Sequence, residues 1–374
     1  MTMPTTTQFP KRKSLVLLSH LLLPHEGNVA SPLARDSNAE LKLELLHLRQ
    51  DEFDDMLALA NLNHVVVRAL ETFLSMMREA DDEIRAEWAA RALEAEHTRI
   101  STALRFLHEI CAVFIERIYG VAVIKSLDHW PDFGSDLDLY TTASPKSVTA
   151  LMIGRFYAEV EARSWGDRLA NKWNFKLPGL RESVEIHVGR LGQTGEQETV
   201  ASSLLQRSRQ ISVGGLAFRV PSVSDRIMIS TMQRMYRHFY FRLCDVIDTA
   251  SLADKRAIDY RELRSLAEAA GIWPGVATYL SIVSDYVRDC RGFGLELPHF
   301  VVSAARFGGD RIYYARGFIR VPIMPQSAAL YGSQLAGILG KRELRNGARL
   351  SLLPWLATAA VIGQKLTGSD KGIW

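Results

Sequence analysis

The hydrophobic pattern of the chain changes at Gly120, and this change restricts the possible folds more than any other feature. Between residues 38 and 118 apolar residues recur mostly at spacings of three and four, as at Leu41, Leu45 and Leu48, and charged residues fill many of the gaps. This period is that of helices with one buried face. From Gly120 onward the apolar runs are short, β-branched and separated by turn residues, which is typical of strands. The sequence therefore predicts an α+β fold, a small mixed sheet flanked by helical regions.

The predicted elements follow from turn and cap signals. Strand character is found at residues 120–126, 137–142, 172–177, 183–188 and 209–220. Pro178-Gly179 and Gly214-Gly215 are turn signals and predict two hairpins. Helices are predicted from Pro145 to about residue 162, from a cap at Ser224, and at residues 243–252 and 260–270. We expect a helical region (1–118), an α/β core (119–222) and a helical region with a basic tail (223–374).

Two apolar segments, one near each end of the sequence, have features of a secretory signal or of a membrane span. Lys11-Arg12-Lys13 followed by an apolar run resembles the start of a secretory signal, but Ser19-His20 interrupts the run and Pro24 ends it. We expect a buried helix there. Residues 350–362 are shorter than the roughly 20 residues of a membrane span and contain Pro354, which favours a core or interfacial helix.

Composition excludes a disordered or fibrous chain, because 47% of the 374 residues are hydrophobic and 23% are charged. The net charge is only +3, yet residues 301–374 contain ten Lys/Arg and three Asp/Glu, or +7, which leaves −4 for the rest. The three cysteines, at positions 111, 244 and 290, have no paired spacing, which argues against a disulfide framework and against a zinc site. A reducing cytoplasm fits this cysteine usage.

Asp136 and Asp138 are the first candidate functional residues. Residues two apart in a strand point to the same side, so both carboxylates face one spot while Leu137 and Leu139 pack into the core. Carboxylates this close raise each other's pKa unless a cation lies between them, and a hard divalent ion, Mg²⁺ or Mn²⁺, suits oxygen ligands. The alternative is a solvated pair at the end of a strand.

Two further features favour a metal and nucleotide site. Lys125-Ser126 ends an apolar run nine residues before Asp136, where backbone amides can reach a triphosphate and Ser126 can add a hydroxyl donor. Glu185 lies between two apolar residues on a later predicted strand and offers a third carboxylate.

The order of these residues resembles the signature of the polymerase-β-like nucleotidyltransferase superfamily. Over most of its length the chain is similar to a bacterial family of largely uncharacterised nucleotidyltransferases. The matching positions are Lys125-Ser126, Asp136-Leu137-Asp138, Glu185-Ile186-His187, His238, Asp245 or Asp248, and Ile258-Asp259-Tyr260. Ser126 stands where this family usually has Gly, and Glu185 stands where Asp is usual.

The resemblance implies transfer of a nucleoside monophosphate from a nucleoside triphosphate to an acceptor hydroxyl, with release of pyrophosphate. Asp136 and Asp138 would bind two Mg²⁺ or Mn²⁺ ions about 3.5–4 Å apart, and Glu185 would complete the ligands and take the hydroxyl proton. Ser126 and Ser135 are the expected phosphate contacts. Lys125 is a further one unless its side chain points away.

Other polar residues have two interpretations each. Lys172, together with Lys176, would hold the triphosphate or only frame a strand. His187 shares the strand face of Glu185 and would contact acceptor, nucleotide or metal, or be a buried histidine with its own partners. His238 lies in an aromatic and basic cluster that suits base stacking, although helix packing is the commoner use. Asp128, His129 and Asp132 are expected to shape the mouth of the site, and Asp245 and Asp248 to form ion pairs with arginines.

Three functions compete at this stage. The leading one is transfer to a small molecule or a glycan precursor. The second is transfer to RNA, such as a tRNA end, as toxins of this type do, because the basic C-terminal residues favour a polyanion; an anionic membrane surface would suit the same charges. The third is a catalytically inactive nucleotide-binding or scaffold protein. The intact carboxylates favour an enzyme.

Overall fold

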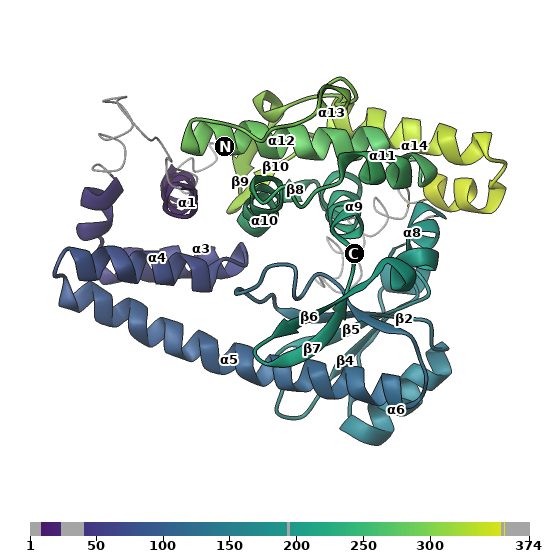
Figure 1. The fold of residues 1–374 in the computed structure, drawn as a ribbon, viewed down its shortest axis with the longest axis horizontal. Helices are drawn as coiled ribbons and strands as arrows, with labels where there is room; N and C mark the ends of the chain where they lie inside the picture. Colours follow the sequence, from purple (N-terminus) through teal and green to yellow (C-terminus); the bar gives the residue numbers. More distant parts are fainter. Residues whose placement is uncertain (1–8, 24–40, 193–194, 353–354, 356–374) are drawn as a thin grey trace, which may run out of the picture.

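Helices form the N-terminal part of the chain. The computed structural model describes residues 9–23, 41–192, 195–352 and 355. The helices before the first strand include α1 (Phe9–Leu22), α3 (Gln50–Leu62), α4 (Val66–Glu79) and α5 (Glu83–Glu116). Leu15, Leu18 and Leu21 of α1 are buried and α1 packs on α3, α4 and α12, which confirms the buried helix predicted for this segment. The long helix α5 runs from the N-terminal helices to the sheet (Figure 1).

A five-stranded mixed sheet follows α5, in the order β1-β2-β5-β4-β3. The strands are β1 (Val121–Val123), β2 (Asp136–Thr141), β3 (Glu159–Val160), β4 (Lys172–Lys176) and β5 (Ser183–Val188). β2 and β5 are parallel, whereas the other neighbours are antiparallel, and β4 and β5 form the hairpin predicted around Pro178-Gly179. The predicted α+β class is confirmed.

Two predicted boundaries in this part are wrong. The helix that begins at Pro145 is α6 (Pro145–Phe156), because Tyr157 adopts a left-handed φ of 52° and the chain then returns to the sheet as β3. Ser222 caps α9 (Val223–Gln233) instead of Ser224, since the Ser222 hydroxyl accepts a hydrogen bond from the backbone N–H of Asp225. Ser224 lies inside the helix and is buried.

A second hairpin covers one side of the sheet region. It consists of β6 (Arg209–Val213) and β7 (Leu216–Val220), joined at Gly214-Gly215 as predicted, and follows the short helix α7 (Trp165–Leu169) and helix α8 (Gly195–Arg207) along the chain. Both turn glycines have positive φ, 57° and 79°, which explains the residue choice. β7 contacts β1 and α5.

The C-terminal part returns to helices, together with a small antiparallel sheet. After α9 its elements include η1 (Arg234–His238, a π-helix), β8 (Tyr240–Phe241), α10 (Leu243–Asp254), α11 (Tyr260–Ala269), α12 (Trp273–Arg291), β9 (Tyr313–Ala315), β10 (Phe318–Arg320) and α14 (Ala328–Gly340). Three short helices lie between these elements, namely α13 (His299–Val302), η2 (Gly309–Arg311) and η3 (Ile323–Ser327). The helices predicted at 243–252 and 260–270 correspond to α10 and α11.

Two hydrophobic cores hold these elements together. One joins residues of α1, α3 and α4 with residues of α9, α10 and α12, so the N-terminal and C-terminal helical regions share a core. The other lies between α5, the five-stranded sheet and the β6–β7 hairpin. The predicted boundaries at residues 118 and 222 stay a prediction.

Within the residues described, none of the helices is both long and apolar enough to cross a membrane. Most of the segment 350–362, predicted as a core or interfacial helix, lies outside them.

Candidate functional site

The parallel pairing of β2 and β5 brings together the acidic residues singled out in the sequence. Asp138 lies opposite Glu185 in the register, and His187 lies two residues further along β5. Leu137 and Leu139 are fully buried, so the acids of β2 face the opposite side from the core. Asp138, Glu185 and His187 each place one possible metal ligand within 4.8 Å of the others. We call these three residues the carboxylate site.

Asp136 borders this site without belonging to the group of three. Burial, together with the charges of Glu185 and Asp138, raises the pKa of Asp136 to about 6. The hydroxyl of Ser135 donates to Oδ2 of Asp136 over 3.1 Å. Ser135 therefore orients a carboxylate, and its predicted contact with phosphate stays a prediction.

Lys125 points into the carboxylate site. Its ammonium group forms an ion pair with Oδ1 of Asp138 and lies 3.4 Å from Nε2 of His187. The backbone of Lys125 has a φ of 62°, and the N–H of Ser126 donates to the carbonyl of Ile124, so Lys125 is the central residue of a γ-turn. Such a left-handed backbone is strained in a residue with a Cβ and occurs preferentially at functional sites.

Ser126 fastens this turn to β2. Its hydroxyl accepts from the N–H of Asp138 over 2.7 Å and donates to the carbonyl of Asp136 over 3.1 Å. Since the only hydroxyl proton is used in this way, the side chain holds the acidic strand and has no donor left for a phosphate.

Lys172 pairs with acids on two sides. Its Nζ lies 2.8 Å from Oε1 of Glu185 and 3.0 Å from Oδ1 of Asp167. Burial alone would lower the pKa of Lys172, but the charges of Glu185 and Asp167 outweigh it and raise the pKa. Lys172 thus orients Glu185, and its predicted contact with nucleotide stays a prediction. Lys176, in contrast, is exposed and pairs with Glu161.

His187 is a buried neutral histidine. Burial, and then the charge of Lys125, lower its pKa well below the usual value. Nε2 lies 3.5 Å from Oδ1 of Asp138 and 4.0 Å from Oε2 of Glu185. Since Nε2 accepts from Lys125, the ring proton is on Nδ1, which is buried and has no hydrogen-bond partner among the described residues.

The donor set fits a divalent cation. It consists of carboxylate oxygens, which are the ligands that Mg²⁺ and Mn²⁺ prefer, and of one neutral imidazole, which suits softer ions. Burial, and after it the charges of Glu185 and Asp138, raise the pKa of Asp136 more than Lys125 and Ser135 lower it. A cation bound by Asp136, Asp138 and Glu185 would remove this repulsion.

The sequence interpretation missed two residues near this site. Asp167, in the capping box of α7, supplies the second partner of Lys172, and no motif marks it. Arg237, on the π-helix η1, lowers by its charge the pKa of both His187 and His238, and its Nε is buried without a partner in the described part of the chain. His238 itself packs against Tyr240. The basic cluster around His238 was the available signal for Arg237.

Buried ion pairs fasten the loop between Ser126 and Asp136 to the helices. Arg68 of α4 binds both Asp132 and Asp248, and Nδ1 of His129 lies 2.5 Å from Oδ2 of Asp248. Asp128 binds Arg226 of α9 over 2.8 Å. These acids therefore anchor the loop. The predicted bracing role of Asp245 and Asp248 is confirmed, with Arg234 and Arg68 as the partners.

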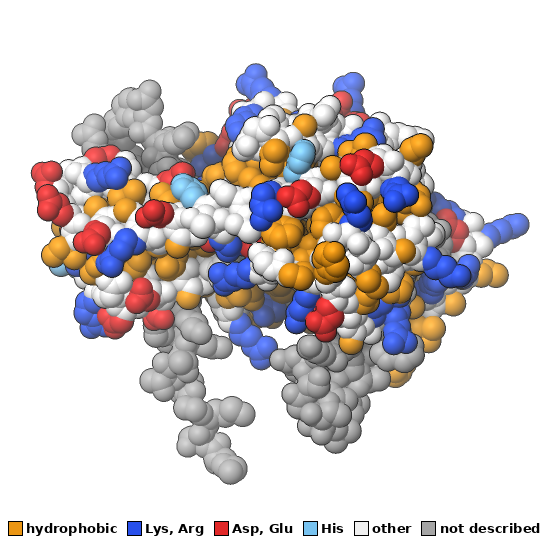
Figure 2. All heavy atoms as spheres, turned by 90° about the horizontal axis from the view of Figure 1, so that it is seen from below, with side chains coloured by type: hydrophobic (Ala, Val, Ile, Leu, Met, Phe, Trp, Pro, Cys, Tyr) orange, Lys and Arg blue, Asp and Glu red, His pale blue; other side chains and the backbone are white. Residues whose placement is uncertain are grey.

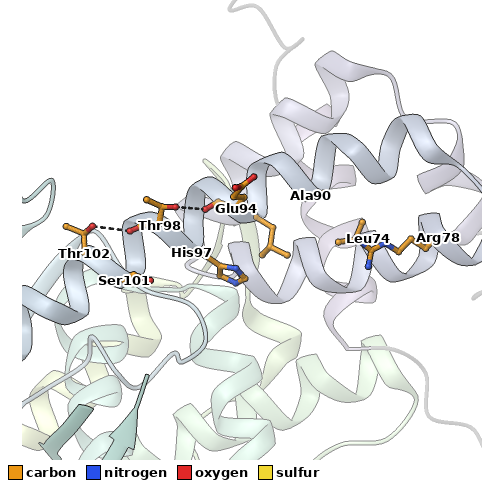
Figure 3. Close-up of a pocket in the computed structure, with 9 residues that line it drawn as sticks. Leu74, Arg78, Ala90, Glu94, His97, Thr98, Ser101 and Thr102 are labelled. Atoms are coloured by element: carbon orange, nitrogen blue, oxygen red, sulfur yellow. Dashed lines mark hydrogen bonds between the residues drawn. The ribbon is translucent and has the colours of Figure 1, made fainter. Parts of the chain in front are cut away.

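A concave surface lies away from the carboxylate site. A groove of about 590 Å³ runs between α4 and α5, and its lining includes Arg78, Glu94 and His97 (Figure 3). The hydroxyls of Thr98 and Thr102 there donate to carbonyls of their own helix. None of the lining residues belongs to the carboxylate site, so this groove does not identify the site of chemistry.

Comparison with models of known protein families gives no match, and comparison with curated proteins gives none either.

Proposed function

We propose that the chain is a metal-dependent nucleotidyltransferase that transfers a nucleoside monophosphate from a nucleoside triphosphate to a hydroxyl of a small molecule or glycan precursor. The observation that carries this proposal is the register of β2 and β5, which places Asp138 beside Glu185 and Asp136 at the edge of the same site. An acid pair on one strand and a third acid on the adjacent parallel strand are the kind of ligand arrangement that metal-assisted transfer at an α-phosphate uses.

The side chains of the carboxylate site provide ligands for the metal ion that the proposed reaction needs. Asp138 and Glu185 would hold Mg²⁺ or Mn²⁺ together with His187, whose ligand atom lies within 4.8 Å of theirs. Asp136, at the edge of the site, would add a further carboxylate. When bound, the ion neutralises triphosphate charge and lowers the pKa of the acceptor hydroxyl. With Asp138 bound to the ion, Lys125 would be left to contact a phosphate oxygen.

Glu185 has the geometry of a general base. Lys172 occupies Oε1, whereas Oε2 faces the site and lies 4.0 Å from His187. Oε2 is therefore the oxygen that receives the proton of the acceptor hydroxyl. Because Lys172 and Asp167 fix the carboxylate, little reorganisation is needed in the transition state.

The reaction is tested with the purified protein, the four labelled nucleoside triphosphates and Mg²⁺, with and without total RNA. Mass spectrometry should detect an acceptor heavier by one nucleoside monophosphate, together with pyrophosphate. Glu185→Gln should keep triphosphate binding and lower turnover by orders of magnitude, because it removes a group needed mainly in the transition state. Glu159→Gln, at an exposed position of β3, is the matched control. Release of orthophosphate and a nucleoside diphosphate would refute the proposal.

RNA is the second candidate acceptor, and the charge distribution favours it. Lys341, Arg342 and Arg345 are exposed just after α14. At the end of the molecule where α14 lies in Figure 1, Figure 2 shows Lys and Arg side chains beside hydrophobic ones. Labelling of an RNA 3′ end in the same screen would select this acceptor over a small molecule.

A further inference from the structure

A second group of possible metal ligands lies outside the carboxylate site. His64 is in the turn between α3 and α4, His129 is in the loop that leads to β2, and Cys244 is near the start of α10. Each offers one ligand atom, and these atoms lie within 4.8 Å of one another. The residues are far apart in the sequence, so cysteine spacing gives no indication of such a group. We call these three residues the His-Cys cluster.

The distances within the His-Cys cluster suit a tetrahedral metal. Nε2 of His129 lies 3.7 Å from Sγ of Cys244. Two ligands at bond lengths of about 2.0 Å (nitrogen) and 2.3 Å (sulfur) on a tetrahedral zinc ion are roughly 3.5 Å apart. The rings of His64 and His129 face each other edge to face, with centroids 5.9 Å apart. Little movement is needed for the three atoms to share one ion.

His129 also has the outer partner that metal-binding histidines use. Oδ2 of Asp248 contacts Nδ1 of His129, while Arg68 holds the other oxygen of Asp248. A carboxylate on the far ring nitrogen fixes the tautomer and directs the remaining lone pair toward the metal. His129 therefore presents Nε2 to Cys244.

A cation also lies beside the His-Cys cluster. Nη1 of Arg242 lies 3.3 Å from Nδ1 of His64 and donates to it. A metal bound at His64 must displace this contact or leave His64 as its weakest ligand. Arg242 is half-buried and is the residue directly before α10.

We propose that the His-Cys cluster binds one borderline-soft transition metal ion of the zinc class, with His64, His129 and Cys244 as the protein ligands and water as the fourth. Thiolate and imidazole ligands select such ions over Mg²⁺, so the two sites differ in the metal they accept. The bound ion would tie three elements together at the loop that carries the chain into Asp136. It would thereby hold the acidic end of β2 in place.

Cobalt(II) titration of the full-length protein, freed of metal by chelation, tests this proposal. We expect one equivalent of Co²⁺ to produce the tetrahedral visible bands and the near-ultraviolet absorption of a cobalt–thiolate bond, both removed by Zn²⁺. Cys244→Ser should abolish the thiolate absorption and His129→Gln should weaken binding at least tenfold. Arg242→Gln should tighten it, because a competing cation is removed.

Two controls separate this site from the others. Cys290→Ser, which changes another buried cysteine, should leave the spectrum unchanged. Asp136→Asn combined with Asp138→Asn should also leave it unchanged, whether or not the chain is a nucleotidyltransferase. A folded wild-type protein without cobalt–thiolate absorption would refute the proposal, even if no variant folds. A spectrum that survives Cys244→Ser, or that disappears with the carboxylate variants, would refute it as well.

Discussion

Replacement of Asp136 by Asn should stabilise the metal-free protein, and the gain should depend on pH in a defined way. Burial and two neighbouring carboxylates raise the pKa of Asp136 from 3.8 to about 6. The folded protein therefore binds a proton at Asp136 more tightly than the unfolded chain does. Stability from this group is complete below about pH 4 and is lost as the pH rises toward 6. Asn carries no charge and does not incur this loss.

The size of the gain follows from the pKa difference. About two pKa units at roughly 1.4 kcal/mol each give roughly 3 kcal/mol above pH 6. With an unfolding entropy of about 2.1 cal/mol/K per residue, a chain of this length gains roughly 4 °C in Tm. Asn can still accept the hydrogen bond of Ser135. Asp55→Asn, at an exposed position of α3, is the control and should change Tm by less than about 1 °C.

The assay is thermal unfolding in EDTA at half-unit steps from pH 4 to 8. The Tm difference between Asp136→Asn and wild type should rise between pH 4 and 6 and then stay constant. With Mg²⁺ and a nucleoside triphosphate the order should reverse, because only the wild type gains ligand-dependent stability. A difference that does not vary with pH, or a loss of stability at pH 8, would refute the argument that Asp136 is a repelled, buried charge.

Three further outcomes are expected. Arg68→Met should lower the free energy of unfolding by about 3–5 kcal/mol in urea titrations, because it removes the cation that pairs with buried Asp132 and leaves Asp248 with His129 alone, whereas the exposed pair of Arg105 and Glu109 should contribute under about 1 kcal/mol. Lys125→Gly should relieve the left-handed backbone yet raise the KM for triphosphate, and an unchanged KM in steady-state assays would remove Lys125 from the nucleotide contacts. The combined variant Lys341→Gln, Arg342→Gln and Arg345→Gln removes three exposed C-terminal charges. It should weaken binding to RNA or to anionic vesicles and reduce the salt dependence of that binding, as measured by fluorescence titration. A wild-type protein without salt-dependent binding would count against both partners.

The sequence predicted those parts of the site that depend on one strand at a time. Alternation placed Leu137 and Leu139 in the core, and the same rule placed Asp136 and Asp138 on the other face. The sequence also marked Glu185 as a third carboxylate on a later strand, but the parallel pairing of β2 with β5 that brings it to Asp138 was not predicted. Local signals also predicted both hairpins and the helices α10 and α11.

What the sequence did not predict depends on contacts between distant segments. The partner of Lys172 on α7 and the loop anchor at Arg68 are ordinary charged residues until the chain folds. The cap at Ser222 was missed because Ser224 lies only two residues away and has the same capping propensity. The end of α6 depends on a left-handed Tyr157, a conformation that Tyr rarely adopts.

The two lysines of the carboxylate site have a consequence for the order in which the site assembles. Lys125 precedes its partner Asp138 by 13 residues, and Lys172 precedes its partner Glu185 by 13 residues. Contacts over such short separations close quickly, whereas the pairing of β2 with β5 closes a much longer loop and is slower. Each acidic strand therefore acquires its own counter-charge before the two strands meet. The sheet can then close between strands whose negative charge is already partly compensated, which reduces the repulsion between Asp138 and Glu185.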